Sequence, residues 1–155
     1  SMPLFFNELY RESDGDVLMM GNDDMVFRTH NWPELVLAEA NKYEDGLFDI
    51  GVTTHNETHY PFSITSRVVA DRLGFYWDPK IYWGDVFLRD VMAQFGRCVM
   101  LPSVCVDHDW AGHAPDATFL ESDQNSIYTR EPNYWNSVHA PAVERAVLRL
   151  RALYA

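Results

Sequence analysis

A short apolar run near the beginning of the chain is the feature that most constrains its fold. Residues Val17 to Met20 are apolar at every position, and they follow a Ser13-Asp14-Gly15 turn and Asp16. A strand with one face in water alternates apolar and polar residues, so this run predicts a short β-strand that is covered on both faces. Such a strand needs a packed layer on either side, which indicates an α/β fold.

The remaining patterns predict helices that alternate with strands. The expected helices span 4–11, 31–43, 66–73, 84–95 and about 139–154, and the expected strands span 16–20, 48–53 and 98–106. Asn31 is a possible N-cap, and Gly74 and Gly96 end the third and fourth helices. Pro102 cannot donate to a strand ladder, so the last strand is expected to be irregular and to lie at a sheet edge. The alternation indicates a mixed sheet flanked by helices.

Length and composition are those of one folded domain. The 155 residues are 47% hydrophobic and 14% aromatic, and no repeat or linker of Pro, Gly and Ser divides them. We therefore expect a single domain over residues 1–155. The net charge of −11, with only 12 Lys and Arg residues, argues against sequence-independent binding to nucleic acid or anionic membranes, because both attract basic residues.

The sequence also predicts where the chain resides. No apolar run approaches the ~20 residues that span a bilayer, and the first residues show no signal-peptide pattern. Cys98 and Cys105 are too few for a disulfide framework. These features together predict a protein of the reducing cytoplasm.

The polar segment Gly21-Asn22-Asp23-Asp24 directly follows the apolar run. Open α/β sheets bind ligands at the carboxyl ends of their strands, and carboxylate oxygens are hard ligands that suit Mg²⁺ or Mn²⁺. The alternative is a polar turn, in which Asn and Asp only reverse the chain.

Two further segments carry groups that could take part in catalysis. Asp85 stands at the start of a predicted helix, where the helix dipole favours an ionised carboxylate that could act as a base, although Asp is also a common N-cap. His108 lies in the segment 107–113 after a strand and could offer its imidazole to a metal or a diphosphate. The alternative for His108 is an ordinary surface loop.

The segment from His55 to His59 carries two histidines four residues apart, but no helical pattern surrounds them. We therefore predict neither a zinc site nor a glycosylation site there, and we interpret the segment as a loop near an acceptor. Several aromatic side chains could stack on sugars, although most are expected to pack in the core or at an interface: Trp77, Tyr82, Trp83, Trp110, Tyr134 and Trp135.

Taken in order, these motifs resemble the second half of GT-A glycosyltransferases, especially their large inverting family. The resemblance covers roughly residues 5 to 120. It comprises a strand leading to a metal motif, with Asn22 replacing the first Asp of the family's Asp-x-Asp pattern, then Asn31-Trp32, Gly84-Asp85, His108 and Asp116-Ala117-Thr118-Phe119. The resemblance implies a partial GT-A, Rossmann-like fold.

The resemblance also implies roles for these residues. Asp24 would be the main ligand of Mn²⁺ or Mg²⁺, Asn22 and Asp23 would assist near the cofactor, and His108 would reach the metal or the diphosphate. Asp85 would take the proton of an acceptor hydroxyl. The implied reaction transfers a sugar from a nucleotide-sugar donor, with a UDP-sugar favoured, to a carbohydrate or other hydroxyl acceptor with inversion.

One departure from the family affects the expected assembly. Family members begin with a Rossmann-like unit that holds the nucleotide, whereas this sequence begins after it. The strand at 16–20 would then have an exposed edge, so we expect a homodimer or higher oligomer in which a partner covers that edge. The alternatives to an active transferase are a non-catalytic binding or assembly module and a metal-dependent hydrolase that uses Asp23, Asp24 and His108.

Overall fold

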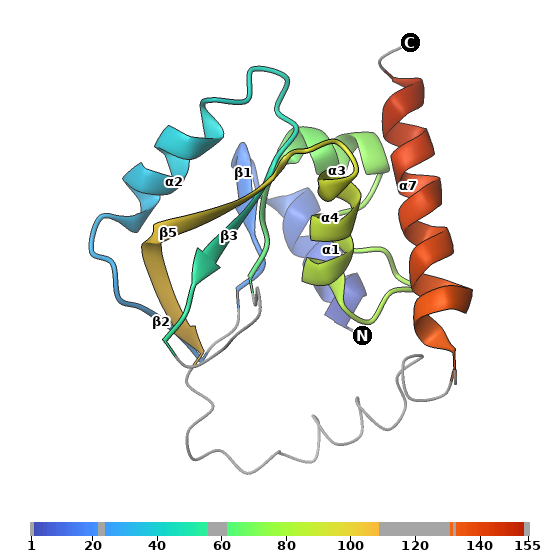
Figure 1. Cartoon of the computed structure of the whole chain (residues 1–155), viewed down its shortest axis with the longest axis horizontal. Helices are drawn as coiled ribbons and strands as arrows, with labels where there is room; N and C mark the ends of the chain where they lie inside the picture. Colours follow the sequence, from blue (N-terminus) through green and yellow to red (C-terminus); the bar gives the residue numbers. More distant parts are fainter. Residues whose placement is uncertain (1, 22–23, 56–61, 109–130, 132, 154–155) are drawn as a thin grey trace.

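The computed structural model describes residues 2–21, 24–55, 62–108, 131 and 133–153 (Figure 1). The elements follow one another as α1 (Met2–Glu12), β1 (Val17–Met19), β2 (Met25–Phe27), α2 (Trp32–Ala40), β3 (Asp49–Thr53), β4 (Ile64–Ser66), α3 (Arg67–Leu73), α4 (Gly84–Ala93), β5 (Cys98–His108), a π-helical segment η1 (Trp135–His139) and α7 (Ala140–Ala152). The predicted α/β fold with a mixed sheet is confirmed.

The described strands form one five-stranded sheet in the order β1-β4-β3-β5-β2. Strands β3 and β5 are parallel, and the other neighbours are antiparallel. The prediction that 98–106 forms an edge strand is wrong, because β5 lies between β3 and β2. Pro102 is tolerated there because the β3–β5 register shifts beside it: Val52 pairs with Leu101, whereas Thr53 pairs with Cys105.

Helices cover both faces of this sheet (Figure 1). On one face, Val36 and Ala40 of α2 pack against strand residues. On the other, α1, α3, α4 and α7 share a second apolar core. Alternate residues of a strand point to opposite faces, and β1 accordingly places Leu18 in the second core while Val17 packs on the first. The short apolar run is therefore covered on both sides, as its pattern predicts.

Helix ends follow the sequence signals in most places. The Ser66 hydroxyl accepts a hydrogen bond from the backbone N–H of Val69 at the start of α3, and Gly74 ends that helix with a φ of 77°. Gly96 has a φ of 65° just after α4. Asn31 occupies the predicted N-cap position of α2, although its side chain makes no capping hydrogen bond.

None of the described helices is both long and apolar enough to cross a membrane.

Candidate functional site

The carboxyl ends of the parallel strands β3 and β5 define the candidate site, since ligands of open α/β sheets bind there. Strand β2 runs antiparallel to β5, and Met25 pairs with His108 in that ladder. Asp24 immediately precedes Met25 and is half-buried. The register thus brings the backbone of Asp24 close to that of His108, although the two residues are far apart in the sequence.

Two of the predicted ligands, Asn22 and Asp23, lie outside the described residues. His108 is described by its backbone place in β5 alone, where it pairs with Met25. Spacing in the sequence could not have predicted that pairing, because the β2–β5 register is a tertiary feature.

Asp85 lies in the first turn of α4, and Trp83 is the residue that flanks the helix start. The alternative in which Asp85 is only the N-cap is therefore wrong. The far end of α4 adjoins the amino ends of the strands, because the Arg97 carbonyl accepts from the backbone N–H of Asp49. The helix consequently begins at the end of the sheet where β3 and β5 finish, which brings Asp85 to the same end as Asp24 (Figure 1).

The electrostatics around Asp85 involve a buried tyrosine. Burial, and after it the negative charges of Asp49 and Asp85, raise the pKa of the Tyr76 phenol well above its ordinary value. Tyr76 therefore stays protonated and neutral across the physiological range. The first-turn position of Asp85 favours its ionised form, because the helix N-terminus carries partial positive charge.

A buried asparagine in α1 holds the segment that leads to Asp85. Asn7 is 2% exposed. Its side-chain oxygen accepts from the backbone N–H groups of Tyr76 at 2.7 Å and Trp77 at 3.0 Å, and its amide donates to the Trp77 carbonyl at 2.7 Å. Sequence reasoning missed Asn7. Its one signal is a polar residue beside Phe6 in an otherwise apolar helix face.

The start of α4 is packed tightly against the same segment. A Cβ atom placed on Gly84 would lie 2.5 Å from ring atoms of Trp77, so only glycine fits without movement. The Trp77 ring is fixed in turn, because its Nε1–H donates to the Ile81 carbonyl at 2.7 Å. Gly84 therefore sets how closely the first turn of α4 approaches Trp77, and with it the position of Asp85.

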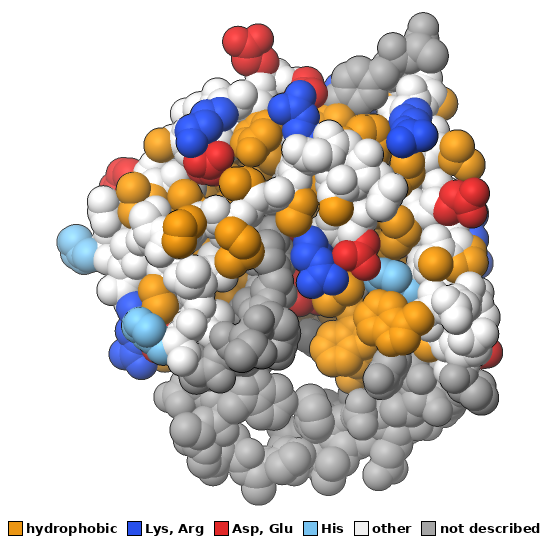
Figure 2. Space-filling model, in the orientation of Figure 1, with side chains coloured by type: hydrophobic (Ala, Val, Ile, Leu, Met, Phe, Trp, Pro, Cys, Tyr) orange, Lys and Arg blue, Asp and Glu red, His pale blue; other side chains and the backbone are white. Residues whose placement is uncertain are grey.

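Aromatic side chains gather between the start of α4 and the start of α7. The backbone N–H of Tyr82 donates to the Tyr134 hydroxyl at 2.9 Å, which ties the two segments together. Trp83 is 37% exposed and Trp135 is 45% exposed. Figure 2 shows large hydrophobic side chains at this place, beside a histidine and a pair of oppositely charged side chains. Trp110 lies outside the described residues.

A second polar cluster lies where β3 ends beside β5. His55, Cys105 and Asp107 offer ligand-type atoms that all lie within 4.8 Å of one another. The His55 backbone N–H and the Arg28 guanidinium hold the pKa of the Asp107 carboxyl well below its usual range. Burial, followed by the charge of Asp107, raises the pKa of the Cys105 thiol. Sequence reasoning missed this cluster, because only the pairing of β3 with β5 brings His55, which follows β3, to Cys105 and Asp107 of β5.

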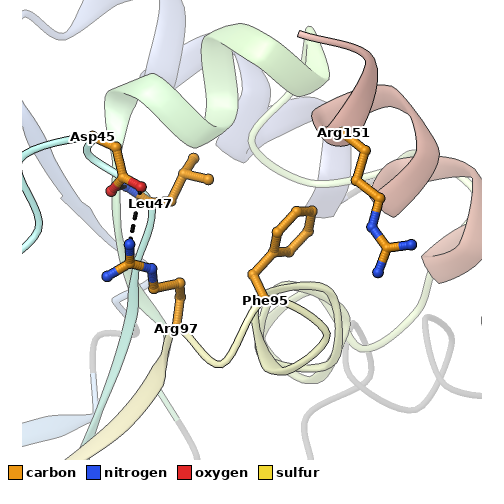
Figure 3. A pocket seen from close by; sticks show the side chains of 5 residues that line it. All are labelled: Asp45, Leu47, Phe95, Arg97 and Arg151. Atoms are coloured by element: carbon orange, nitrogen blue, oxygen red, sulfur yellow. Dashed lines mark hydrogen bonds and ion pairs between the residues drawn. The ribbon is translucent and has the colours of Figure 1, made fainter. Parts of the chain in front are cut away.

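The hollow in Figure 3 lies at the opposite end of the sheet. It is lined by Asp45, Leu47, Phe95, Arg97 and Arg151. Asp45 and Arg97 precede β3 and β5, so the hollow is at the amino ends of the parallel strands. Arg97 Nη2 lies 3.2 Å from Asp45 Oδ2, and the two charges form an ion pair. This hollow is separate from the candidate site.

Comparisons with known proteins support the fold. No protein-family model matches the chain, and no curated protein shows significant sequence similarity to it. Among solved structures, the chain is similar to a mannosyltransferase from Pyrobaculum calidifontis in complex with GDP-mannose and Mn²⁺. The TM-score is 0.54 at 15% identity, over 97% of this chain and 53% of that one. The chain therefore has a glycosyltransferase-like α/β fold and spans about half the length of that enzyme.

Proposed function

We propose that this chain carries the metal and acceptor side of a nucleotide-sugar-dependent glycosyltransferase of the GT-A type. The β2–β5 register is the observation that supports the proposal, because Met25 pairs with His108 and Asp24 directly precedes Met25 at the carboxyl end of the sheet. Asp24 and His108 are the two residues that the motif order selects for the metal. Support also comes from the fold, which resembles that of a mannosyltransferase in complex with GDP-mannose and Mn²⁺.

The donor set suits a hard or borderline divalent cation. A carboxylate from Asp24 and an imidazole from His108 are ligands that Mn²⁺ accepts, and the neighbouring Asn22 and Asp23 add oxygen atoms. A cation held there would neutralise negative charge on the departing nucleoside diphosphate. Asp24 and His108 would orient that diphosphate towards the acceptor.

Asp85 is the proposed general base. Its place in the first turn of α4 favours the carboxylate, and the segment before that turn is held by hydrogen bonds to Asn7. Asp85 would take the proton of the acceptor hydroxyl as the oxygen attacks the anomeric carbon, which gives inversion. The exposed face of Trp83, two residues away, would stack on the C–H surface of a carbohydrate acceptor.

The proposal leaves two classes of nucleotide-sugar donor to be compared. UDP-sugars and GDP-sugars are both donors to test. The motif resemblance suggests the first, and the structural neighbour suggests the second.

Strand β1 pairs with β4 and lies at one edge of the described sheet. We propose that this edge is covered by a second copy of the chain, since an exposed strand edge pairs readily.

The proposed function can be tested by measuring sugar transfer. The assay contains the purified chain, Mn²⁺ and a panel of UDP- and GDP-sugars. Asp85→Asn removes the base but keeps the size and hydrogen-bonding shape of the side chain, so transfer should fall by about 10²- to 10⁴-fold. Glu34→Gln is the matched control, because Glu34 is an exposed acidic residue in the first turn of α2. Equal transfer by wild type and Asp85→Asn would overturn the role of Asp85.

A further inference from the structure

The cluster of His55, Cys105 and Asp107 at the end of β3 has the ligand types of a metal site. Cys105 and Asp107 alternate along β5 with Val104 and Val106, which fill the core that α2 covers. The two ligand-type side chains therefore share the opposite face of the strand. His55 follows β3, whose Thr53 pairs with Cys105, so it lies beside them. We propose that His55, Cys105 and Asp107 bind a Zn²⁺-type transition-metal ion.

The distances fit tetrahedral coordination. His55 Nδ1 lies 3.5 Å from Cys105 Sγ and 3.3 Å from Asp107 Oδ1, and Sγ lies 3.8 Å from the same Oδ1. Zinc bonds of about 2.0–2.3 Å at tetrahedral angles separate neighbouring ligand atoms by about 3.3–3.8 Å. One ion can therefore contact all three atoms with little movement of the side chains.

Neighbouring groups hold the carboxylate in place for a metal. The His55 backbone N–H donates to Asp107 Oδ1 at 2.9 Å, and Arg28 Nε donates to Asp107 Oδ2 at 2.7 Å. Ligating carboxylates are commonly fixed by such outer hydrogen bonds. The His55 side chain is 73% exposed, so solvent reaches the cluster and a water molecule could supply a fourth ligand.

The ligand types separate this site from the proposed Mn²⁺ or Mg²⁺ site. A thiolate and an imidazole are softer ligands than carboxylate oxygens, and they select zinc over magnesium or manganese. Binding releases the Cys105 proton to solvent, and the thiolate and the Asp107 carboxylate then balance the two positive charges of the ion. Two chemically different cations would thus lie at the same end of the sheet.

Titration of the purified chain with Co²⁺ tests the site, because cobalt replaces zinc and a cobalt–thiolate bond gives a charge-transfer absorption band. We expect one equivalent of Co²⁺ to produce this band and stoichiometric Zn²⁺ to remove it. Cys105→Ser should abolish the band. Cys98→Ser is the matched control, since Cys98 lies on the same strand outside the cluster, and it should keep the band.

Two further variants guard against a folding artefact and against confusion with the proposed Mn²⁺ site. His55→Ala changes an exposed side chain and should weaken Zn²⁺ binding by more than about tenfold without lowering the melting temperature. Asp24→Ala should leave the cobalt band unchanged, even if it removes nucleotide binding. Absence of the band from wild type, or its persistence in Cys105→Ser, would show that the cluster is only an ion pair among Arg28, His55 and Asp107.

Discussion

The two ends of the parallel pair β3 and β5 are used differently. At the amino end, Gly96 turns the chain, and Arg97 pairs with Asp45 beside the small hollow. The carboxyl end holds the start of β2, which follows Asp24, and the first turn of α4, which contains Asp85. The amino end is closed by a turn and by an ion pair between residues 52 apart, whereas the carboxyl end carries the residues proposed for chemistry. Substitutions at the two ends should accordingly have different consequences.

The carboxyl end also depends on contacts made from outside the sheet. Asn7 in α1 bonds the backbone of Tyr76 and Trp77, and Trp77 in turn packs on Gly84. These contacts position the first turn of α4 without touching a substrate. Substitutions at these contacts should therefore lower both the stability of the fold and the proposed activity.

Asn7→Ala should give the largest loss of stability. The substitution removes three hydrogen bonds and leaves the buried Tyr76 N–H without its acceptor, which costs about 2–4 kcal/mol in the free energy of unfolding. Urea denaturation followed by circular dichroism measures the change. Asn136→Ala, at an exposed asparagine in η1, is the control and should change little. A loss below about 0.5 kcal/mol for Asn7→Ala would contradict the role given to Asn7.

The elements that sequence patterns predicted well are those whose signals are local. The helix predicted over 66–73, its helix-ending Gly74 and the apolar Val17–Met20 run each depend on neighbours in the chain. The position of β5 was wrongly predicted, because Pro102 indicated an edge strand and the register shift that tolerates it is not encoded locally.

The candidate site was predictable only in part. Motif order selected Asp24, Asp85 and His108 as candidates, but their spatial relation depends on the β2–β5 register and the direction of α4. Asn7 and the His55–Cys105–Asp107 cluster were missed, since each acts across segments that lie far apart in the sequence. Long-range pairing of this kind leaves no regular spacing for a pattern to detect.

Gly84→Ala should have a smaller effect on stability but a clear one on the geometry. The added methyl group would meet the Trp77 ring at 2.5 Å, and the required movement costs about 1–3 kcal/mol. The melting temperature should fall, and sugar transfer should fall with it because Asp85 shifts. Gly96→Ala at the amino end meets no atom within 4 Å, although its positive φ adds strain. Gly96→Ala should destabilise the fold without a specific loss of sugar transfer. Equal losses of transfer in Gly84→Ala and Gly96→Ala would contradict the difference between the two ends of the strands.

Asp45→Asn should have the smallest effect. The variant loses the partly exposed ion pair with Arg97, worth up to about 1 kcal/mol, but its side-chain oxygen can still accept from the Leu47 backbone N–H. The free energy of unfolding should differ slightly between Asp45→Asn and wild type. It is measured at low and at high salt. Metal-dependent nucleotide binding should be unchanged; its loss would show that the amino end takes part in donor binding.

The proposed function of the carboxyl end of the β3–β5 pair is tested most directly by calorimetry. The chain is titrated with UDP- and GDP-sugars in the presence and absence of Mn²⁺. The account predicts binding by wild type that requires Mn²⁺, its loss in Asp24→Ala and its retention in Asp45→Asn. Equal binding by wild type and Asp24→Ala, or no Mn²⁺-dependent binding of any of these donors by wild type, would contradict it.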